Sequence, residues 1–334
     1  MSLSKSLLGF SPILDAIIRD FAFLASWYGD FHPANTGDVS QVLDPALAAA
    51  LSARFANSAS RWFAIERMED LATIRADGRG GYRGQGIRHP DYFELIKGMG
   101  GRIFLITSTG SQLPAIGQTL SEGECGRLLN LIEVDPAARQ IRILYGNTEF
   151  GTLPSIETHV HILANAISIA EGHPSPATVH AHPYHLVLPG RDKDIRGDFG
   201  LFNALIYTQV EGLNRNCEEL IGIVTYQESG SENLAVASMK ALGMHRLVLW
   251  MHHGFVVREA TIRRAYTLMS YAEECARAAL DSLRTGACGL PLESIKAFLE
   301  ARGLVADYHN ACDLVARRSA ADPATTPARG NGAV

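Results

Sequence analysis

Two pairs of histidines in this sequence are spaced as metal ligands could be, with one residue between the members of each pair. The pairs are His159 with His161 and His180 with His182. Side chains two residues apart point about 200° apart on an α-helix but to the same side of a β-strand. Apolar residues recur at helical spacing around the first pair, whereas the second pair ends a run of small and β-branched residues that favours a strand. We therefore expect the second pair, and not the first, to converge on one metal ion.

A third imidazole is needed because catalytic zinc sites typically have three protein ligands and one position left open. The best candidate is His253, which follows the apolar run 246–251 and precedes Gly254. That run is typical of a central strand, and the glycine permits a sharp change of direction at its end. His252 faces the opposite way in an extended chain. The sequence thus predicts a site for Zn²⁺, or for another divalent metal, made by His180, His182 and His253.

A carboxylic acid lies close to a predicted helix start. Glu157 is expected in the first turn of a helix over 156–171, with Ser155 as its cap. Such a group could carry the proton that metal-assisted chemistry on a carbonyl compound needs. An acid that merely stabilises the helix dipole is the simpler alternative. Helix N-termini and tight turns also attract anions, so this helix end and the turn Ser108-Thr-Gly-Ser111 could bind phosphate together.

The elements that would position these residues alternate along the chain. Alternation of this kind predicts a mixed α/β fold whose strands need not all be parallel. A glycine-rich surface loop is expected over 75–89 and a disordered tail over 319–334. Strands are predicted over 102–107, 140–145, 177–182, 220–226 and 246–251. Helices are predicted over 11–27, 45–55, 156–171, 261–283 and 291–302.

Composition limits the kinds of partner that this chain can have. With 334 residues, 47% of them hydrophobic, it can bury a large core. Its formal net charge of −5 and the lack of Lys and Arg clusters argue against nucleic-acid binding and favour a small polar substrate. Charged residues interrupt the apolar N-terminal stretch, so we expect no signal peptide and no membrane span. Five scattered cysteines predict reduced thiols in the cytoplasm: Cys125, Cys217, Cys275, Cys288 and Cys312.

Several motifs, in this order, resemble those of the class II aldolase/adducin family. The resemblance runs from about residue 100 to 285, and within the family it is strongest to the rhamnulose-1-phosphate aldolases. The closest matches are the block Leu247-Val-Leu-Trp-Met-His-His-Gly254 and the segment Ser-Gly-Ser-Glu-Asn233 before it. The other motifs are Ile106-Thr-Ser-Thr-Gly-Ser111, Leu153-Pro-Ser-Ile-Glu157, Val179-His-Ala-His182 and Tyr271-Ala-Glu-Glu274.

The resemblance implies a three-layer α/β/α fold around a mainly antiparallel sheet, as one domain over 1–318 with an N-terminal helical extension. It implies zinc on the three histidines, Glu157 as the acid/base residue, and a homo-oligomer, which is a tetramer in many members. The expected reaction cleaves a ketose, such as rhamnulose 1-phosphate, to dihydroxyacetone phosphate and a hydroxyaldehyde through an enediolate. The residues expected to bind substrate or its phosphate are Asn57, Ser108, Thr109, Gly110 and Ser155.

Two departures from the family pattern concern the phosphate. The usual Gly-Asn pair early in the chain, which helps to bind phosphate, has no match in 55–60, where Asn57 is the nearest substitute. Ile156 stands where members have a second hydroxyl residue. Each lost charge-assisted hydrogen bond costs about 1.5–3 kcal/mol of binding free energy. A related sugar-phosphate epimerase, dehydratase or decarboxylase would use the same residues, and a non-catalytic adducin-like module would be expected to lose the metal ligands.

Overall fold

A computed structural model describes most of the chain and divides it into two compact units. The first unit comprises Met1–Pro183 and Gly222–Thr267, and the second comprises Tyr184–Ile221 and Leu268–Val334. The single domain over 1–318 stays a prediction. The described residues are 7, 9–31, 37–56, 61–74, 82–111, 128–146, 152–187, 192–287 and 289–321.

The first unit is built on one sheet, in which the described residues form nine strands in the order β2-β5-β4-β3-β1-β6-β9-β8-β7. Each neighbouring pair is antiparallel except β7 with β8, so the predicted mainly antiparallel sheet is confirmed. The predicted strands correspond to β3, β5, β6, β7 and β8, whereas the other four were not predicted. The strands are β1 (Gly37–Val42), β2 (Phe63–Ala64), β3 (Ile103–Thr107), β4 (Leu129–Val134), β5 (Gln140–Tyr145), β6 (Ala177–Ala181), β7 (Gly222–Val224), β8 (Leu247–Trp250) and β9 (Gly254–Glu259).

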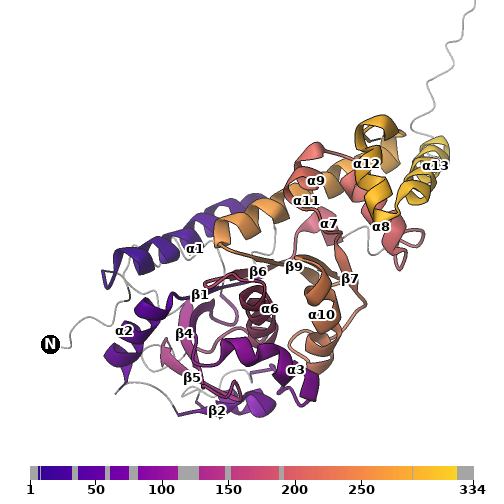
Figure 1. Ribbon diagram of the computed structural model, residues 1–334. Helices are drawn as coiled ribbons and strands as arrows, with labels where there is room; N and C mark the ends of the chain where they lie inside the picture. Colours follow the sequence, from indigo (N-terminus) through magenta and orange to yellow (C-terminus); the bar gives the residue numbers. More distant parts are fainter. Residues whose placement is uncertain are drawn as a thin grey trace, which may run out of the picture. The chain divides into compact units, whose positions relative to one another are not determined.

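One face of the sheet is covered by several helices (Figure 1). The helix α6 (Thr158–Ala170) is buried from its first residue to Ser168 and lies against β1, β6 and β9. Beside it lies α10 (Glu232–Met244), and α3 (Pro90–Leu95) and the 3-10 helix η2 (Ile96–Met99) pack on it as well. Apolar side chains from these elements, the strands and the 3-10 helix η1 (Ile65–Ile74) form a single core cluster.

The opposite face of the sheet carries α1 (Pro12–Phe31) and α2 (Pro45–Phe55), as Figure 1 shows. A bulge in the pairing of β4 with β5 turns Tyr145 toward α2, where its ring lies 5.6 Å from that of Phe55. Asp44 caps α2 by accepting a hydrogen bond of 2.9 Å from the backbone N–H of Ala46. Helices on both faces give three layers, so the predicted α/β/α fold class is confirmed.

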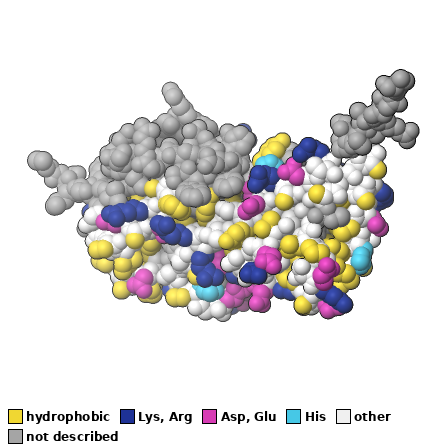
Figure 2. Space-filling model, turned by 90° about the horizontal axis from the view of Figure 1, so that it is seen from above, with side chains coloured by type: hydrophobic (Ala, Val, Ile, Leu, Met, Phe, Trp, Pro, Cys, Tyr) yellow, Lys and Arg dark blue, Asp and Glu magenta, His cyan; other side chains and the backbone are white. Residues whose placement is uncertain are grey.

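The face of the molecule seen in Figure 2 has acidic and basic side chains interspersed with apolar ones. No helix in the described part of the chain combines the length and the hydrophobicity that a membrane span requires. In the predicted glycine-rich loop, residues 82–89 have no regular secondary structure, and residues 75–81 lie outside the described part.

The second unit is helical in its described part. Its apolar cluster includes Ile295, Leu299, Leu304 and Tyr308, and Gly303 ends α12 in the left-handed conformation with φ of 68°. The predicted helices over 261–283 and 291–302 correspond to α11 and α12, whereas α7, α8, α9 and α13 were not predicted. The helices are α7 (Tyr184–Val187), α8 (Phe199–Tyr207), α9 (Glu211–Asn216), α11 (Ile262–Thr285, which begins in the first unit), α12 (Leu292–Arg302) and α13 (Val305–Ala321).

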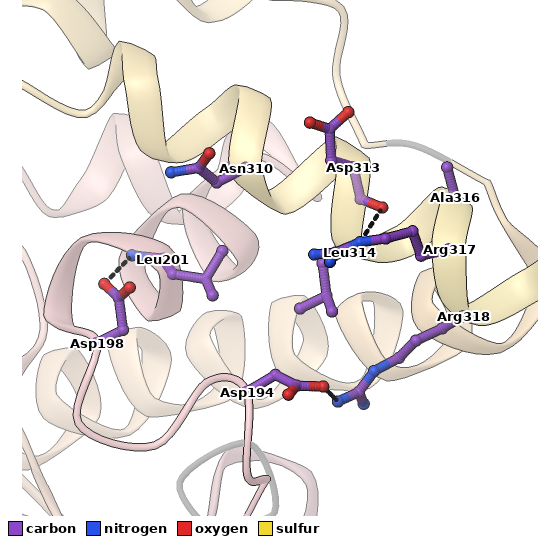
Figure 3. Close-up of a pocket in the computed structure, with 9 residues that line it drawn as sticks. All are labelled: Asp194, Asp198, Leu201, Asn310, Asp313, Leu314, Ala316, Arg317 and Arg318. Atoms are coloured by element: carbon purple, nitrogen blue, oxygen red, sulfur yellow. Dashed lines mark hydrogen bonds and ion pairs between the residues drawn. The ribbon is translucent and has the colours of Figure 1, made fainter.

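A polar pocket lies between α8 and α13 within this unit (Figure 3). At its edge, Arg318 of α13 donates hydrogen bonds to both oxygens of Asp192, at 2.5 and 2.7 Å, and also pairs with Asp194. The helix continues to Ala321, so it extends past residue 319, where we expected the tail to begin. The rest of the predicted tail lies outside the described residues.

Candidate metal centre

Three imidazole rings meet at one end of the first unit's sheet. His180 lies on β6, His182 follows that strand, and His253 lies in the turn between β8 and β9. Their ring centroids are 4.9, 5.0 and 5.2 Å apart, and one ligand nitrogen from each lies within 4.8 Å of the others. The Nε2 atoms of His180 and His182 are 3.1 Å apart. Two nitrogens on a tetrahedral Zn²⁺ would be about 3.3 Å apart at the usual bond length, so the geometry fits this ion.

The backbone of Gly254 makes room for two of these rings. A Cβ atom at Gly254 would lie 2.5 Å from Cε1 of His180 and 2.6 Å from Cδ2 of His182. It would also lie 2.6 Å from the carbonyl oxygen of Ala181. Any larger residue would therefore push the imidazoles or the strand aside. The glycine was expected to permit a sharp turn, and the structure shows that it is needed for close approach.

The rings are held in the orientation and protonation state that a metal needs. Nδ1 of His180 lies 3.1 Å from the carbonyl oxygen of Phe255, to which it donates, so Nε2 is the unprotonated nitrogen of the neutral ring. Trp250 stacks on His253 with centroids 5.1 Å apart and contacts His180 at 4.7 Å. Burial lowers the pKa of His180 well below its ordinary value and the pKa of His253 to about 4. Both imidazoles are therefore neutral near pH 7. His252 has φ of 62° and faces Tyr226, not the other three rings.

A buried carboxyl group adjoins the imidazoles. One oxygen of Glu157 lies 3.1 Å from Nε2 of His180 and the other 3.3 Å from Nε2 of His253. The helix α6 begins at Thr158, so Glu157 occupies the position before the first turn and not a place within it. Ser155 does not cap the helix through its side chain as we expected. Its Oγ instead accepts a hydrogen bond of 3.1 Å from the Glu157 N–H.

A second carboxyl group, which the sequence analysis missed, belongs to Asp38 on β1. It faces His180 across the antiparallel β1–β6 pair and lies within 4.8 Å of both His180 and Glu157. Burial, followed by the charge of Asp38, raises the pKa of Glu157 well above its ordinary value. Burial also raises the pKa of Asp38 to about 6. Two acids this close hold a proton between them more tightly than either would alone, whereas a divalent cation at the histidines would favour their ionised forms.

The substrate-binding residues predicted from the sequence lie partly around this centre. Thr109, Gly110 and Ser155 line the cavity next to the imidazoles, together with Gly37, Ser111, Ile156 and Ser229. Ser108 is buried beside it and accepts a hydrogen bond of 2.7 Å from the side chain of Asn130. Asn57 lies outside the described residues. The metal, acid/base and substrate roles of these residues stay predictions.

Gly37, Asp38 and Ser229 line the cavity although the sequence analysis gave them no role. Ser229 Oγ lies 3.1 Å from Nε2 of His253. A signal for Asp38 was available, because Gly37-Asp38 is a Gly-Asn pair in which a carboxyl group replaces the amide. Ser229 begins the segment Ser-Gly-Ser-Glu-Asn233, whose resemblance to the family was noted but which was given no role in the site.

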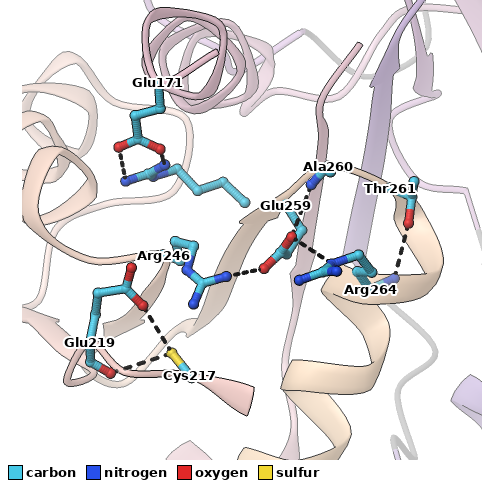
Figure 4. Close-up of polar contacts among 9 residues, drawn as sticks. Glu171, Cys217, Glu219, Arg246, Glu259, Ala260, Thr261 and Arg264 are labelled. Atoms are coloured by element: carbon cyan, nitrogen blue, oxygen red, sulfur yellow. Dashed lines mark hydrogen bonds and ion pairs between the residues drawn. The ribbon is translucent and has the colours of Figure 1, made fainter. Parts of the chain in front are cut away.

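The far end of β9 is held by charged side chains (Figure 4). Glu259 is buried and pairs with Arg246, just before β8, and with Arg264 of α11, whose Nε lies 3.2 Å from it. The neighbouring Arg258 is buried as well and pairs with Glu171 at the end of α6. These contacts fix the strand whose first residue is Gly254.

Comparison with known proteins agrees with this architecture. The family profile described as the Class II Aldolase and Adducin N-terminal domain matches residues 125–280. The rhamnulose-1-phosphate aldolase of Listeria monocytogenes serovar 1/2a is 21% identical over 180 residues, which is 54% of this chain and 63% of that protein. The enzyme of the same name from Enterococcus faecalis is 21% identical over 187 residues, 56% of this chain and 64% of that protein. The chain thus spans less than two thirds of the length of these curated relatives.

A solved structure supports the fold. The sugar-phosphate aldolase from Thermotoga maritima superposes with a TM-score of 0.56 at 20% identity, covering 82% of this chain and 98% of that one. At this identity the likeness extends to the fold alone. The segment 125–280 belongs to the class II aldolase and adducin family, and the similarity to the curated relatives agrees with this.

Proposed function

We propose that this protein is a zinc-dependent aldolase that cleaves a carbon–carbon bond of a ketose. The observation that carries the proposal is the convergence of three imidazoles on one point, with one oxygen of Glu157 3.1 Å from Nε2 of His180 and the other 3.3 Å from Nε2 of His253. His180, His182 and His253 would hold the ion, and Zn²⁺ suits three imidazole ligands best. Another divalent metal would fit the same donor set.

When bound, the ion would supply Lewis-acid stabilisation to negative charge that develops on the substrate oxygens. Glu157 handles the proton. In cleavage, the hydroxyl group that becomes the aldehyde loses its proton to water, and the bond breaks with its electron pair on the carbon next to the carbonyl group. This gives an enediolate, and Glu157 returns a proton to that carbon. In condensation it removes the same proton.

The finer features of the proposal come from the family resemblance and the relatives' names. The curated relatives are named rhamnulose-1-phosphate aldolase, so rhamnulose 1-phosphate is the first substrate to test. Its expected products are dihydroxyacetone phosphate and a hydroxyaldehyde. We also propose a cytoplasmic homo-oligomer, in the form of a tetramer. Thr109, Gly110 and Ser155 are proposed to contact the substrate, since they line the cavity beside the imidazoles.

Metal analysis and product analysis on one preparation test the proposal. After expression with added zinc, the purified protein should contain one zinc per chain and should release an aldehyde from one member of a panel of free and phosphorylated ketoses. Zinc well below one per chain would favour the non-catalytic adducin-like module. An epimer, a dehydrated product or carbon dioxide without aldehyde release would replace the aldolase with the corresponding related enzyme.

A further inference from the structure

We propose that the cavity beside the three histidines receives an unphosphorylated, hydroxyl-bearing end of its substrate, and that Asp38 disfavours a phosphate group there. This inference rests on the proposed function and narrows its substrates to ketoses without phosphate at the end that enters the cavity. It therefore places unphosphorylated ketoses ahead of rhamnulose 1-phosphate. The argument uses the polar groups of the cavity wall and the hydrogen bonds they already make.

The charged side chains of the cavity wall are acidic. Asp38 and Glu157 line it, and none of the described residues that line it is a lysine or an arginine. A phosphate group has three oxygens that only accept hydrogen bonds and carries about two negative charges. A carboxyl group can offer it at most one donor hydrogen and otherwise repels it. Phosphate-binding sites are built instead from arginine, lysine and free backbone N–H groups.

Ser108, Thr109 and Ser155 were expected to help bind phosphate, and their backbone N–H groups already have partners within the protein. The N–H of Thr109 donates to the carbonyl oxygen of Leu153 at 2.8 Å, and that of Ser155 donates to the carbonyl oxygen of Thr107 at 3.0 Å. At the start of α6, the N–H groups of Glu157 and Thr158 both donate to Ser155, at 3.1 and 3.2 Å. A helix N-terminus binds an anion through unpaired N–H groups. At the start of α6, most of these N–H groups already donate to oxygen atoms of the protein.

The same wall suits sugar hydroxyl groups. A hydroxyl group donates one hydrogen bond and accepts others, so it can donate to the Asp38 carboxyl group and accept from the side chain of Thr109. Asp38 lies beside His180 and Glu157, so a substrate group that contacts Asp38 also lies next to the candidate metal site. The lining therefore favours a polyhydroxylated, uncharged end over a phosphorylated one.

Two enediolate mimics that differ only in phosphate test this inference. Calorimetry on the zinc-loaded full chain would compare glycolohydroxamate with phosphoglycolohydroxamate. In a phosphate-binding pocket, phosphate should tighten binding about tenfold or more for each charge-assisted hydrogen bond. We expect no such gain, so that glycolohydroxamate binds at least as tightly. In Asp38→Asn, the preference should shift toward the phosphorylated mimic by about tenfold.

A matched control removes an acid away from the cavity. Asp44→Asn keeps a good cap on α2 and should leave the preference unchanged. Tighter binding of phosphoglycolohydroxamate to the wild-type chain would overturn this inference and leave the aldolase proposal standing. Binding of neither mimic in the presence of zinc would overturn the proposed function and this inference with it. An unchanged preference in folded Asp38→Asn would remove Asp38 from the explanation. The wild-type comparison remains decisive even if that variant fails to fold.

Discussion

Replacing Gly254 by alanine adds one methyl group at the point where two candidate metal ligands meet the start of β9. The new Cβ would lie 2.5 Å from Cε1 of His180 and 2.6 Å from Cδ2 of His182. The carbonyl oxygen of Ala181 would be 2.6 Å away and, as backbone in β6, would have little freedom to move. The methyl group would therefore displace the imidazole rings.

The size of the effect follows from these distances. Ordinary contact begins at 3.4 Å, so relief requires shifts of about 0.9 Å (3.4 − 2.5) for His180 and about 0.8 Å (3.4 − 2.6) for His182. Metal sites tolerate deviations of only about 0.2 Å in ligand distance. Changes that merely reorient one ligand cost about 10–100-fold in metal affinity. With two ligands displaced, we expect Gly254→Ala to lower zinc affinity about 100-fold or more, and overpacking to lower the free energy of unfolding by about 1–3 kcal/mol.

Competition with a chromogenic chelator would measure the zinc affinity, and urea unfolding of the metal-free protein would measure stability. Gly243→Ala provides the matched control, because a Cβ there meets no atom within 4 Å and the residue lies in α10. That variant should bind zinc as the wild type does and gain up to about 1 kcal/mol of stability, since alanine favours a helix more than glycine does. If Gly254→Ala also bound zinc as the wild type does, the role assigned to the close approach at Gly254 would be refuted.

Three further predictions concern single side chains. Glu157→Gln should keep full zinc content while turnover of the substrate falls by about 10²–10⁴-fold, and a parallel loss of zinc would contradict its role as proton carrier. The hydrogen bond from Arg318 lowers the pKa of Asp192, so Arg318→Ala should lower the free energy of unfolding at about pH 7. This loss should become smaller as the pH falls below 3.8, the ordinary pKa of the acid, and urea unfolding at about pH 3 and about pH 7 would measure it. Glu259→Gln should lower the free energy of unfolding by about 1–3 kcal/mol in urea, because it weakens the pairing with Arg246; an unchanged midpoint would show that this pair contributes little.

The choice between the two histidine pairs could be made from sequence because it depends only on local periodicity. His159 and His161 do lie in α6, and Nδ1 of His161 is 2.8 Å from the hydroxyl oxygen of Ser40. His180 and His182 lie at the end of β6 on one side. The period of the apolar residues around each pair was enough to distinguish them.

The approach of Asp38 to the site could not be predicted in the same way. Asp38 reaches His180 through the pairing of β1 with β6, which joins residues separated by about 140 positions. Periodicity indicates that a segment is a strand, but it carries no information on which strand will be its neighbour. The helix α10 was missed although Ser231 caps it, because its apolar residues form only a weak stripe and several positions are exposed.

The register of β9 connects the candidate site with the rest of the sheet. A slip of β9 by one residue against β6 would bring Phe255 to the place of Gly254, where even a methyl group has no room. At the other end of the strand, Glu259 opposes such a slip because Arg246 and Arg264 hold its buried carboxylate from two different elements. An ion-pair network that touches none of the histidines therefore helps to determine where the imidazoles lie. Residues that fix a ligand's position need not be near the ligand in sequence or in space, provided that a single strand transmits the constraint.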